Sequence, residues 1–517
     1  MLTKSDPDEI QSFLIDASNM QGGHAARVVF PDSIEEVCEV LARATRERTP
    51  LAVSGAGTGV VGGRVPFGGT VLATDRLNRI KEISFEGEEG GPHSHAAACG
   101  WAIAEAGVVL ADFQRAVEAR GMLYPPDPTE RSCYLGGSVA TNASGARTFK
   151  YGPTRHYIRR LKIALATGDV LDLARGAVHA DKDGRIRLPL DGGRRSLLAR
   201  LPSYQMPHTR KHASGYYVAR GMDALDLFIG SEGTLGVICE VETTLLPKPE
   251  GVLSGGVFFK TLEDLLAFVR EARDASLKTR GENKSRGAEL HSMIDARALE
   301  YLDDRSLEFL SDKFPLIPGG AAGAIFFEQE TTAQTEESLM ALWLALLERH
   351  HALVDDSWFA TSERDRAQIR EFRHALPVLV NEWLAHHQQR KVSTDMAVPD
   401  AEFARILSFY RETLNASRLQ YVIFGHIGDN HVHVNILPRD ACEAATARDI
   451  YRRFVEEIVR AGGTISAEHG IGKLKRDYLR ALYTEAHLRE MAALKKNLDP
   501  ACILGRGNIF PEEFLRQ

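Results

Sequence analysis

The chain has 517 residues, a formal net charge of −7 and 44% hydrophobic residues, which is enough for two or three domains with cores of their own. Charges of both signs are mixed along it without a basic block, so it lacks the electrostatic footprint of a nucleic-acid-binding protein. Its six cysteines form no CxxC pair, which argues against a zinc ribbon, an iron–sulfur cluster or a disulfide scaffold.

The cysteines and the N-terminal residues favour a cytoplasmic protein. Residues 1–14 lack a basic segment followed by an apolar stretch, so they do not resemble a signal peptide. No apolar run reaches the roughly 18 residues of a membrane-spanning helix. Peripheral contact at the inner face of a membrane and homodimerisation both stay open. The thiols expected to be reduced and mostly buried are Cys38, Cys99, Cys133, Cys239, Cys442 and Cys502.

The first half of the chain reads as short strands and helices joined by glycine turns. Ser33 and Glu36 form a capping-box pattern, and apolar residues follow at helical spacing. Further along, the pattern predicts a strand at Pro50–Gly55, a helix at Asp112–Ala119, one alternating strand at Leu161–Leu173, a long connector at Arg194–Gly215, and a buried strand, a glycine turn and a second strand within Leu227–Pro249.

Beyond Pro247 and Pro249, long charged helices alternate with apolar strands such as AAGAIFFEQE. The helices are expected at Thr261–Ala275, Glu337–His350 and Glu363–Ala375. We therefore expect an α+β protein with a first domain at 1–249, a second at 250–460, and a C-terminal segment at 461–517 that returns to glycine loops and helix.

Three segments are unusually rich in glycine and small residues: Ser54–Gly63, Pro125–Gly152 and Gly230–Val237. The first follows a predicted strand and exposes backbone N–H groups that can hold a pyrophosphate, although it lacks the GK[ST] of a P-loop. A tight turn is the alternative interpretation of that segment alone. Three such segments spread along the chain favour an extended dinucleotide cofactor over a single phosphate.

Two segments near the C-terminal end concentrate metal-ligating side chains. HIGDNHVHVN begins at His426, and SAEHGIGK contains Glu468 and His469. His431, His433 and Asn435 are spaced by two, so on a strand they share one face. Imidazole and carboxylate together suit Zn²⁺, Mn²⁺ or Fe²⁺. The alternative is a pair of surface loops whose histidines are hydrogen-bonded in the ordinary way.

The glycine-rich segments and these motifs, in this order, resemble the vanillyl-alcohol oxidase / p-cresol methylhydroxylase (PCMH) superfamily, and more narrowly its D-2-hydroxy acid dehydrogenase branch. KHASGYYV (Lys211–Val218) also follows in family order, HIGDNHVHVN matches HxGDGNxHxN, and SAEHGIGK matches GEHGIG. The resemblance runs from about residue 25 to the C-terminus. It implies a PCMH-type FAD-binding domain, an α+β cap domain that binds the substrate, and a C-terminal segment that returns to the FAD domain.

The resemblance also implies which residues hold FAD. Relatives that attach their flavin covalently often carry a histidine at the position of Thr58, which cannot form that link, so non-covalent FAD is expected. The implied FAD residues are Ser54, Gly55, Gly57, Thr58, Gly59, Gly62, Gly63, Pro126, Asp127, Thr129, Ser132, Gly136, Gly137, Thr141, Asn142, Ser144, Gly145, Glu232, Thr234, Gly236 and Ile238.

For the chemistry, the resemblance implies that His426, His433 and Glu468 bind a divalent metal, with Zn²⁺ favoured over Mn²⁺ or Fe²⁺, and that His469 is the general base. Arg373 matches an arginine that binds the substrate carboxylate, a partner suited to a bidentate guanidinium. A solvated arginine on a helix face is the alternative. Asn435 is a further substrate contact.

The chain departs from the family pattern at three places. Asn430 and His431 stand where the family has Gly-Asn, so His431 is an additional candidate for the metal or substrate site. GRGNIF (Gly505–Phe510) replaces the family's Asn-Pro-Gly-Lys at the flavin. Ser393 stands where dicarboxylate-specific relatives have a lysine, which favours a substrate other than 2-hydroxyglutarate.

The sequence therefore predicts FAD- and metal-dependent oxidation of a D-2-hydroxy acid such as D-lactate or glycolate to the 2-oxo acid, with the hydride passing to flavin N5. No NAD-binding βαβ pattern is present, so a quinone, a cytochrome or an electron-transfer flavoprotein is the expected acceptor. Three alternatives stay open: a flavin oxidase that uses O₂, a non-redox enzyme resembling alkylglycerone-phosphate synthase, and an electron-transfer subunit with a vestigial site.

Overall fold

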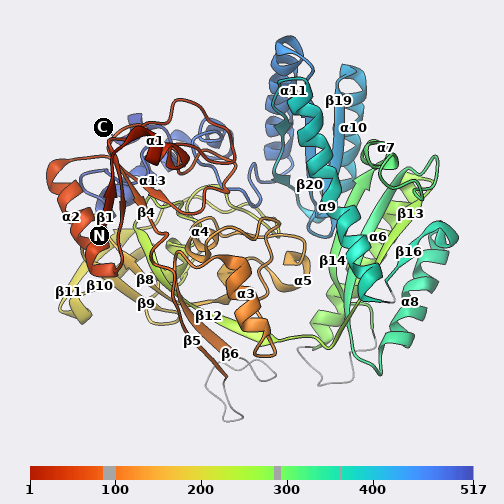
Figure 1. Ribbon diagram of the computed structural model, residues 1–517, viewed down its shortest axis with the longest axis horizontal. Coiled ribbons are helices and arrows are strands. Elements are labelled where there is room, and N and C mark those ends of the chain that lie inside the picture. The colour runs from red at the N-terminus through yellow and green to blue at the C-terminus, as the bar shows by residue number, and fades with distance from the viewer. Residues whose placement is uncertain (86–99, 284–292, 361, 516–517) are drawn as a thin grey trace.

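The computed structural model describes residues 1–85, 100–283, 293–360 and 362–515. Two lobes lie side by side in Figure 1, and the chain passes from the first to the second between β12 and β13. The C-terminal helix α13 lies in the first lobe with the N-terminal elements, so the chain returns to the lobe in which it began. Helices and strands are present in both lobes, which confirms the α+β class.

The described residues of the first lobe form three sheets. The smallest is a hairpin of β10 and β11, and a four-stranded sheet has the order β1-β2-β4-β3, in which β2 and β3 both run parallel to β4. An antiparallel six-stranded sheet has the order β5-β6-β12-β8-β9, with β7 beside β12. The strands are β1 (Leu2–Lys4), β2 (Arg27–Phe30), β3 (Leu51–Ser54), β4 (Thr70–Ala73), β5 (Ile80–Phe85), β6 (Gly100–Glu105), β7 (Met122–Leu123), β8 (Ile158–Ala164), β9 (Val170–Ala174), β10 (Arg185–Leu190), β11 (Arg195–Arg200) and β12 (Val237–Pro247).

Helices cover these sheets. The predicted capping box begins α2, since the Ser33 hydroxyl accepts a hydrogen bond from the Glu36 N–H at 3.3 Å. Val37 and Leu41 on its inner face are fully buried. The helices of this part of the chain are α1 (Pro7–Ile10), α2 (Ile34–Glu47), α3 (Leu110–Glu118), α4 (Leu135–Ala140) and α5 (Thr148–Tyr151).

The second lobe is one large antiparallel sheet with helices packed on it. Its order is β16-β13-β15-β14-β19-β20-β17, with β18 paired to β20. The strands are β13 (Gly251–Phe259), β14 (Ala296–Asp303), β15 (Gly323–Thr331), β16 (Trp358–Phe359), β17 (Val392–Ser393), β18 (Met396–Ala397), β19 (Gln420–Gly425) and β20 (His431–Leu437). The helices are α6 (Leu262–Asn283), α7 (Asp304–Ser311), α8 (Glu336–Arg349), α9 (Glu363–His386), α10 (Phe403–Ser417) and α11 (Ala441–Arg460).

The two lobes meet where α5 of the first packs against β14 of the second. Every residue of β14 is buried, because the strand is covered on both faces. Lys150 on α5 reaches Glu330 at 2.8 Å and Asp295 at 2.9 Å across this contact. The interface therefore combines apolar packing with charge pairs, and it places β14 beside the first lobe.

The residues after α11 return to the first lobe and complete its four-stranded sheet. The helices here are α12 (Leu479–Leu482) and α13 (Glu485–Leu498). Beyond them, Leu504 pairs with Leu51 of β3, and the Leu51 N–H donates to the Ile503 carbonyl at 2.8 Å. The buried ammonium of Lys495 holds this end in place through the Thr234 and Leu504 carbonyls.

Several predicted elements are wrong. Leu161–Leu173 is not one strand but β8 and β9, because Gly168 adopts φ +88° and turns the chain back on itself. The connector predicted at Arg194–Gly215 contains β11. The first strand predicted from Leu227 is absent. Leu227 ends a 3₁₀ turn, Ala224–Leu227, which the Asp223 carboxylate caps by accepting the Leu225 N–H, and residues 228–230 continue as a turn.

The thiols are less buried than expected. Cys99 lies outside the described residues, and the five described cysteines are free, but only Cys239 among them is buried and Cys442 is exposed. None of the helices in the described part of the chain is long and apolar enough to cross a membrane.

Candidate active site

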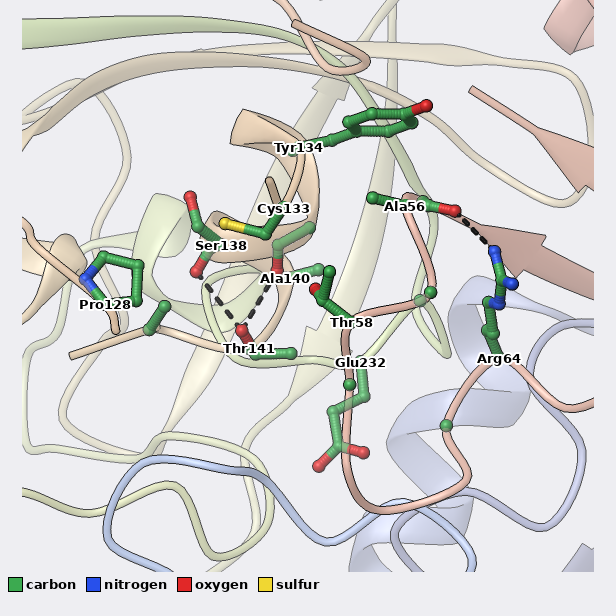
Figure 2. Close-up of a pocket in the computed structure, with 18 of the residues that line it drawn as sticks. Ala56, Thr58, Arg64, Pro128, Cys133, Tyr134, Ser138, Ala140, Thr141 and Glu232 are labelled. Carbon is green, nitrogen blue, oxygen red and sulfur yellow. Dashed lines mark hydrogen bonds between the residues drawn. The ribbon is translucent and has the colours of Figure 1, made fainter. Parts of the chain in front are cut away.

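A cavity of about 320 Å³ lies between the three glycine-rich segments of the first lobe, and Figure 2 shows part of its wall. Backbone and small side chains form most of the wall, so a large ligand can approach the main chain closely. The lining includes thirteen of the residues implied for FAD: Gly55, Gly57, Thr58, Gly59, Gly63, Thr129, Gly136, Gly137, Thr141, Ser144, Glu232, Gly236 and Ile238.

The other implied FAD residues lie in the same segments but off the wall: Ser54, Gly62, Pro126, Asp127, Ser132, Asn142, Gly145 and Thr234. Some of them maintain the shape of the wall instead. The Asn142 side-chain carbonyl accepts the Arg155 N–H at 3.0 Å. A Cβ on Gly145 would lie 2.1 Å from the Asp127 carbonyl, so this position requires glycine. These residues position the lining rather than form it.

Arg64 and Tyr134 line the cavity although sequence reasoning did not single them out. The Arg64 guanidinium donates to the Ser54 hydroxyl at 3.0 Å and to the Gly55 carbonyl at 2.8 Å, and Figure 2 shows it lying back along the first glycine loop. The sequence did offer a reason to choose Arg64. It directly follows Gly63 in a loop of the phosphate-binding type, where a cation can neutralise a pyrophosphate.

Glu232 connects the cavity to the SAEHGIGK segment. Its carboxylate accepts the N–H groups of Ile471 and Gly472, both at 2.7 Å. Burial raises the pKa of Glu232, and these two hydrogen bonds oppose the rise. A Cβ on Gly470 would lie 2.8 Å from a Glu232 carboxylate oxygen, so the glycine allows this close approach. The segment that carries Glu468 and His469 is thereby fixed against the cavity wall.

A cluster of ligating side chains, which we call the His/Glu cluster, consists of His426, His431, His433 and Glu468. Ligand atoms of all four lie within 4.8 Å of one another. His426 follows β19 and precedes a one-turn 3₁₀ helix, Ile427–Asp429, and the other two histidines lie on β20. The sequence prediction had named His426, His433 and Glu468 as ligands, and the structure brings these three together.

Hydrogen bonds orient two of the imidazoles. His426 Nδ1 lies 2.7 Å from a Glu300 carboxylate oxygen, and His433 Nδ1 lies 3.0 Å from the Thr394 carbonyl. Their Nε2 atoms therefore face Glu468 Oε1, at 3.4 and 3.3 Å. Metal–ligand bonds of about 2.0–2.1 Å at tetrahedral angles separate neighbouring ligand atoms by roughly 3.3 Å. The donor set and its spacing fit a divalent metal ion.

The charges in the cluster are tightly paired. Burial favours neutral forms, but the neighbouring Glu300 carboxylate raises the pKa of His426 to about 9. Burial opposes ionisation of Glu300 as well, yet His426 and Arg373 lower its pKa to about 2. His426 and Lys211 likewise hold the pKa of Glu468 well below its usual value. A metal ion that binds Nε2 of His426 must therefore displace a proton from it.

Lys211 is a fully buried cation that sequence reasoning did not single out. Its ammonium donates to the Gly145 carbonyl at 2.9 Å and lies 3.4 Å from Glu468 Oε2 and 3.3 Å from Asp429. The Ser144 hydroxyl donates to the same Glu468 oxygen at 3.3 Å. These contacts fix Oε2 and leave Oε1 facing the imidazoles. The KHASGYYV motif drew attention to this segment, but nothing in the neighbouring sequence indicated that the Lys211 side chain would point toward Glu468.

His469, the predicted base, lines the cavity together with Glu468. Its Nδ1 lies 3.5 Å from Asp395 Oδ2 and its Nε2 lies 3.6 Å from Glu468 Oε1. Burial lowers the pKa of His469 to about 4, so the ring is neutral at pH 7. Asp395 also accepts the His469 N–H at 3.0 Å and the Lys475 ammonium at 2.7 Å. The cavity and the His/Glu cluster thus meet at Glu468 and His469.

The two predicted substrate contacts lie around the cluster. Arg373 on α9 donates to Glu300 at 3.2 Å, and Glu300 in turn bonds His426. Asn435 lies on β20 two residues after His433 and is buried. Among the described residues, its side-chain carbonyl has no hydrogen-bond partner. A buried unpaired acceptor beside a ligand cluster is a candidate for contact with a bound molecule.

Comparison with known proteins agrees with this arrangement. Residues 25–174 match the FAD binding domain family, and residues 288–509 match the FAD linked oxidases, C-terminal domain family. Together the two matches cover more than two thirds of the chain. They define the class of protein, which is an FAD-linked oxidoreductase.

Full-length relatives narrow the class. The chain is 28% identical to "Glycolate oxidase subunit GlcD" of Bacillus subtilis, over 94% of this chain and 89% of that protein. It is 28% identical to "D-lactate dehydrogenase" of Anaerostipes hadrus, over 92% and 88%. It is 24% identical to "D-2-hydroxyglutarate dehydrogenase" of Stutzerimonas stutzeri, over 98% and 95%. The chain belongs to the D-2-hydroxy acid dehydrogenase branch of the vanillyl-alcohol oxidase / PCMH superfamily.

Two solved structures of alkyldihydroxyacetonephosphate synthase share the fold. Their TM-scores are 0.62 and 0.64 at 14% and 15% identity, and each comparison covers 97% of this chain and 82% of the solved one. At this identity the likeness concerns the fold alone. Together with the two family matches, it confirms the expected fold, a PCMH-type FAD-binding domain with a second α+β domain and a C-terminal segment that returns to the first.

Proposed function

We propose that the protein oxidises a D-2-hydroxy acid, of the size of D-lactate or glycolate, to the 2-oxo acid with FAD and a divalent metal. One observation carries the proposal: Glu468 Oε1 lies 3.3–3.4 Å from the Nε2 atoms of two oriented histidines, and the adjacent His469 lines the glycine-rich cavity. The side chains expected to bind a metal thus border the space expected to hold the flavin.

When bound, FAD supplies a hydride acceptor at N5, and a metal held by His426, His433 and Glu468 supplies Lewis acidity to the substrate hydroxyl. We propose Zn²⁺ in preference to Mn²⁺ or Fe²⁺, because imidazoles outnumber carboxylates and the ligand spacing suits a tetrahedral ion. Lys211 and Ser144 hold the other Glu468 oxygen, so the carboxylate keeps one oxygen turned toward the ligand position.

His469 receives the hydroxyl proton at Nε2 in this proposal. Asp395 faces its Nδ1 at 3.5 Å, which favours the tautomer with the proton on Nδ1 and leaves the Nε2 lone pair available. The ring is neutral at pH 7 because burial lowers its pKa to about 4. Its position on the cavity wall lets it act beside the flavin rather than at the protein surface.

Arg373 and Asn435 are the proposed substrate contacts. Arg373 donates one hydrogen bond to Glu300. A guanidinium has five N–H donors, so Arg373 can still bind a substrate carboxylate. The unpaired Asn435 side-chain carbonyl suits a substrate hydroxyl. Ser393 offers no positive charge for a second substrate carboxylate, which favours a monocarboxylate.

Non-covalent attachment of FAD is part of the proposal, since Thr58 lies on the cavity wall at the position of the covalent histidine in other superfamily members. The purified protein should be yellow and should release its flavin on acid or heat denaturation. Flavin that stays with the precipitated polypeptide would refute the non-covalent attachment.

The main test is anaerobic flavin reduction by a panel of substrates, with and without a chelator. D-Lactate or glycolate should bleach the flavin, D-2-hydroxyglutarate should do so more slowly, and L-lactate should serve as the stereochemical control. Chelation should stop bleaching, and added Zn²⁺ should restore it. Equal bleaching after complete metal removal would contradict the metal-dependent mechanism.

We propose a quinone, a cytochrome or an electron-transfer flavoprotein as the electron acceptor, because the sequence contains no NAD-binding βαβ pattern. Reoxidation of the reduced enzyme separates this from an O₂-using oxidase. A dehydrogenase should reoxidise slowly in air and quickly with a soluble quinone analogue. Fast reoxidation by O₂ alone, with stoichiometric hydrogen peroxide, would favour the oxidase instead.

A further inference from the structure

We propose that His431 is a fourth protein ligand, so that the His/Glu cluster binds its metal with three imidazoles and one carboxylate. The inference rests on the metal dependence proposed above and goes beyond its three ligands, His426, His433 and Glu468. It concerns a residue at which this chain departs from its family's motif, since an asparagine stands there in HxGDGNxHxN.

The position of His431 is the first support. Its ring is fully buried at the start of β20, with its centroid 4.5 Å from that of His433 and 5.4 Å from that of His426. Its Nδ1 lies 3.9 Å from Glu468 Oε2. It therefore belongs to the same group of converging ligand atoms, all within 4.8 Å of one another.

Its hydrogen bonding is the second support. Neither nitrogen of the His431 ring has a hydrogen-bond partner among the residues that the structure describes. A polar atom buried in this way costs stability unless something occupies its lone pair. A metal at the centre of the cluster would take the lone pair of Nδ1, which is the nitrogen on the Glu468 side.

The surroundings of the three rings show a common pattern, which is the third support. Metal-binding histidines usually offer their other nitrogen to a carboxylate or a carbonyl. His426 offers Nδ1 to Glu300, and His433 offers Nδ1 to Thr394. His431 follows this pattern in position, since its Nε2 atom lies 3.1 Å from Asp395 Oδ1, although not aligned as a hydrogen bond.

The chemical consequence is a change in metal binding. Imidazole nitrogen binds late first-row divalent ions such as Co²⁺, Ni²⁺ and Zn²⁺ more strongly than an amide oxygen does. Zinc can expand from four to five ligands during catalysis, so four protein ligands still leave one position for an oxygen of the 2-hydroxy acid. The site should therefore hold Zn²⁺ more tightly than the three-ligand set alone, and still admit the substrate.

The test counts imidazoles directly, on the full chain with FAD bound and one equivalent of Zn²⁺ added. X-ray absorption at the zinc edge should show three imidazoles in the wild type and two in His431→Asn. Loss of a group that merely orients a ligating histidine weakens metal binding about 10–100-fold, so loss of a ligand should weaken Zn²⁺ binding at least about 100-fold in chelator competition. His350→Asn is the matched control, because this half-buried histidine pairs with Glu271 on the far helices and should leave Zn²⁺ binding unchanged.

Each outcome bears on a different claim. Zinc bound by only two imidazoles in the wild type would overturn the fourth ligand and leave the proposed function intact. Full retention of Zn²⁺ in His431→Asn would do the same. A wild type that binds no Zn²⁺ yet reduces its flavin with substrate would overturn both. The number of imidazoles bound to zinc in the wild type is enough to test the fourth ligand. The test therefore holds even if the variant misfolds and loses FAD.

Discussion

The glycine-rich cavity and the His/Glu cluster meet at Glu468, yet they are built in opposite ways. The cavity is shaped by missing side chains, because its wall is mostly backbone and small residues from three glycine-rich segments. The cluster is made of long side chains whose outer atoms are held by partners such as Glu300, Thr394 and Lys211. The first site should fail when atoms are added, and the second when atoms are removed.

The largest expected effect is in the cluster. His433→Ala removes one imidazole without touching the glycine segments, so FAD should stay bound while metal is lost. Lewis-acid stabilisation is worth several kcal/mol, so flavin reduction should slow by about 10³-fold or more at 1.36 kcal/mol per tenfold. Metal analysis, flavin content and stopped-flow reduction together measure this. Loss of FAD from a folded variant would show that the two sites are not separable.

The second comparison lies within the neighbouring pair Glu468 and His469. Glu468→Gln should lose metal, because a neutral amide replaces an anionic ligand. His469→Asn should keep metal and FAD but slow flavin reduction by about 10²–10⁴-fold, the usual range for a positioned acid–base group. Metal lost from His469→Asn but retained by Glu468→Gln would reverse the two roles.

Gly57→Ala tests the cavity by adding atoms. Gly57 has φ +81°, and a Cβ there would lie 2.3 Å from the Arg64 guanidinium, which would have to move along the wall. FAD binding should weaken at least about tenfold, or 1.4 kcal/mol, while the metal stays bound. Gly176→Ala is the matched control, because its φ of +85° gives similar backbone strain with no atom within 4 Å and no contact with the cavity. Equal FAD retention in both variants would contradict this account of the wall.

The effect of Glu300→Gln should be limited to metal affinity and its pH dependence, because this change leaves all ligands in place. Above pH 9, metal affinity should fall about 10–100-fold, as for other partners of ligating histidines. In the wild type, affinity should also fall as the pH drops below about 9, because protons compete for Nε2 of His426, whose pKa Glu300 raises to about 9. In the variant, metal affinity should stay constant to a lower pH, because His426 without the Glu300 charge binds its proton less tightly. Competition with a chelator at several pH values measures both effects.

The sequence predicted the glycine wall and the ligand cluster because both are encoded in a few short segments, three for the wall and two for the cluster. The spacing of His431, His433 and Asn435 placed them on one strand, and β20 is that strand. Among the residues that sequence reasoning missed, Glu300 acts from another strand, and Asp395 acts from the short link between β17 and β18. Glu300 lies in β14, where nothing in ARALEYLD distinguishes a metal-site partner from an ordinary buried carboxylate.

The errors in the predicted elements have a similar cause. Periodicity within Leu161–Leu173 is strand-like on both sides of Gly168, and only the positive φ of that glycine shows that the chain reverses. Near Leu227, the apolar run predicts a strand, but the Asp223 carboxylate caps a 3₁₀ turn that ends at Leu227. In both cases one local hydrogen bond or dihedral angle outweighed an apolar pattern.

The pairing of Leu504 with Leu51 has a consequence for how the protein forms in the cell. Domains commonly fold from the N-terminal end while the ribosome is still adding residues. Here the edge of β3, next to the first glycine loop, cannot acquire its last neighbour until residues 503–505 have been synthesised. The second lobe, by contrast, is encoded without interruption between β13 and α11 and can fold first. The second lobe should therefore finish folding before the first, although the first lobe begins earlier in the sequence. The cofactor should be taken up after translation ends.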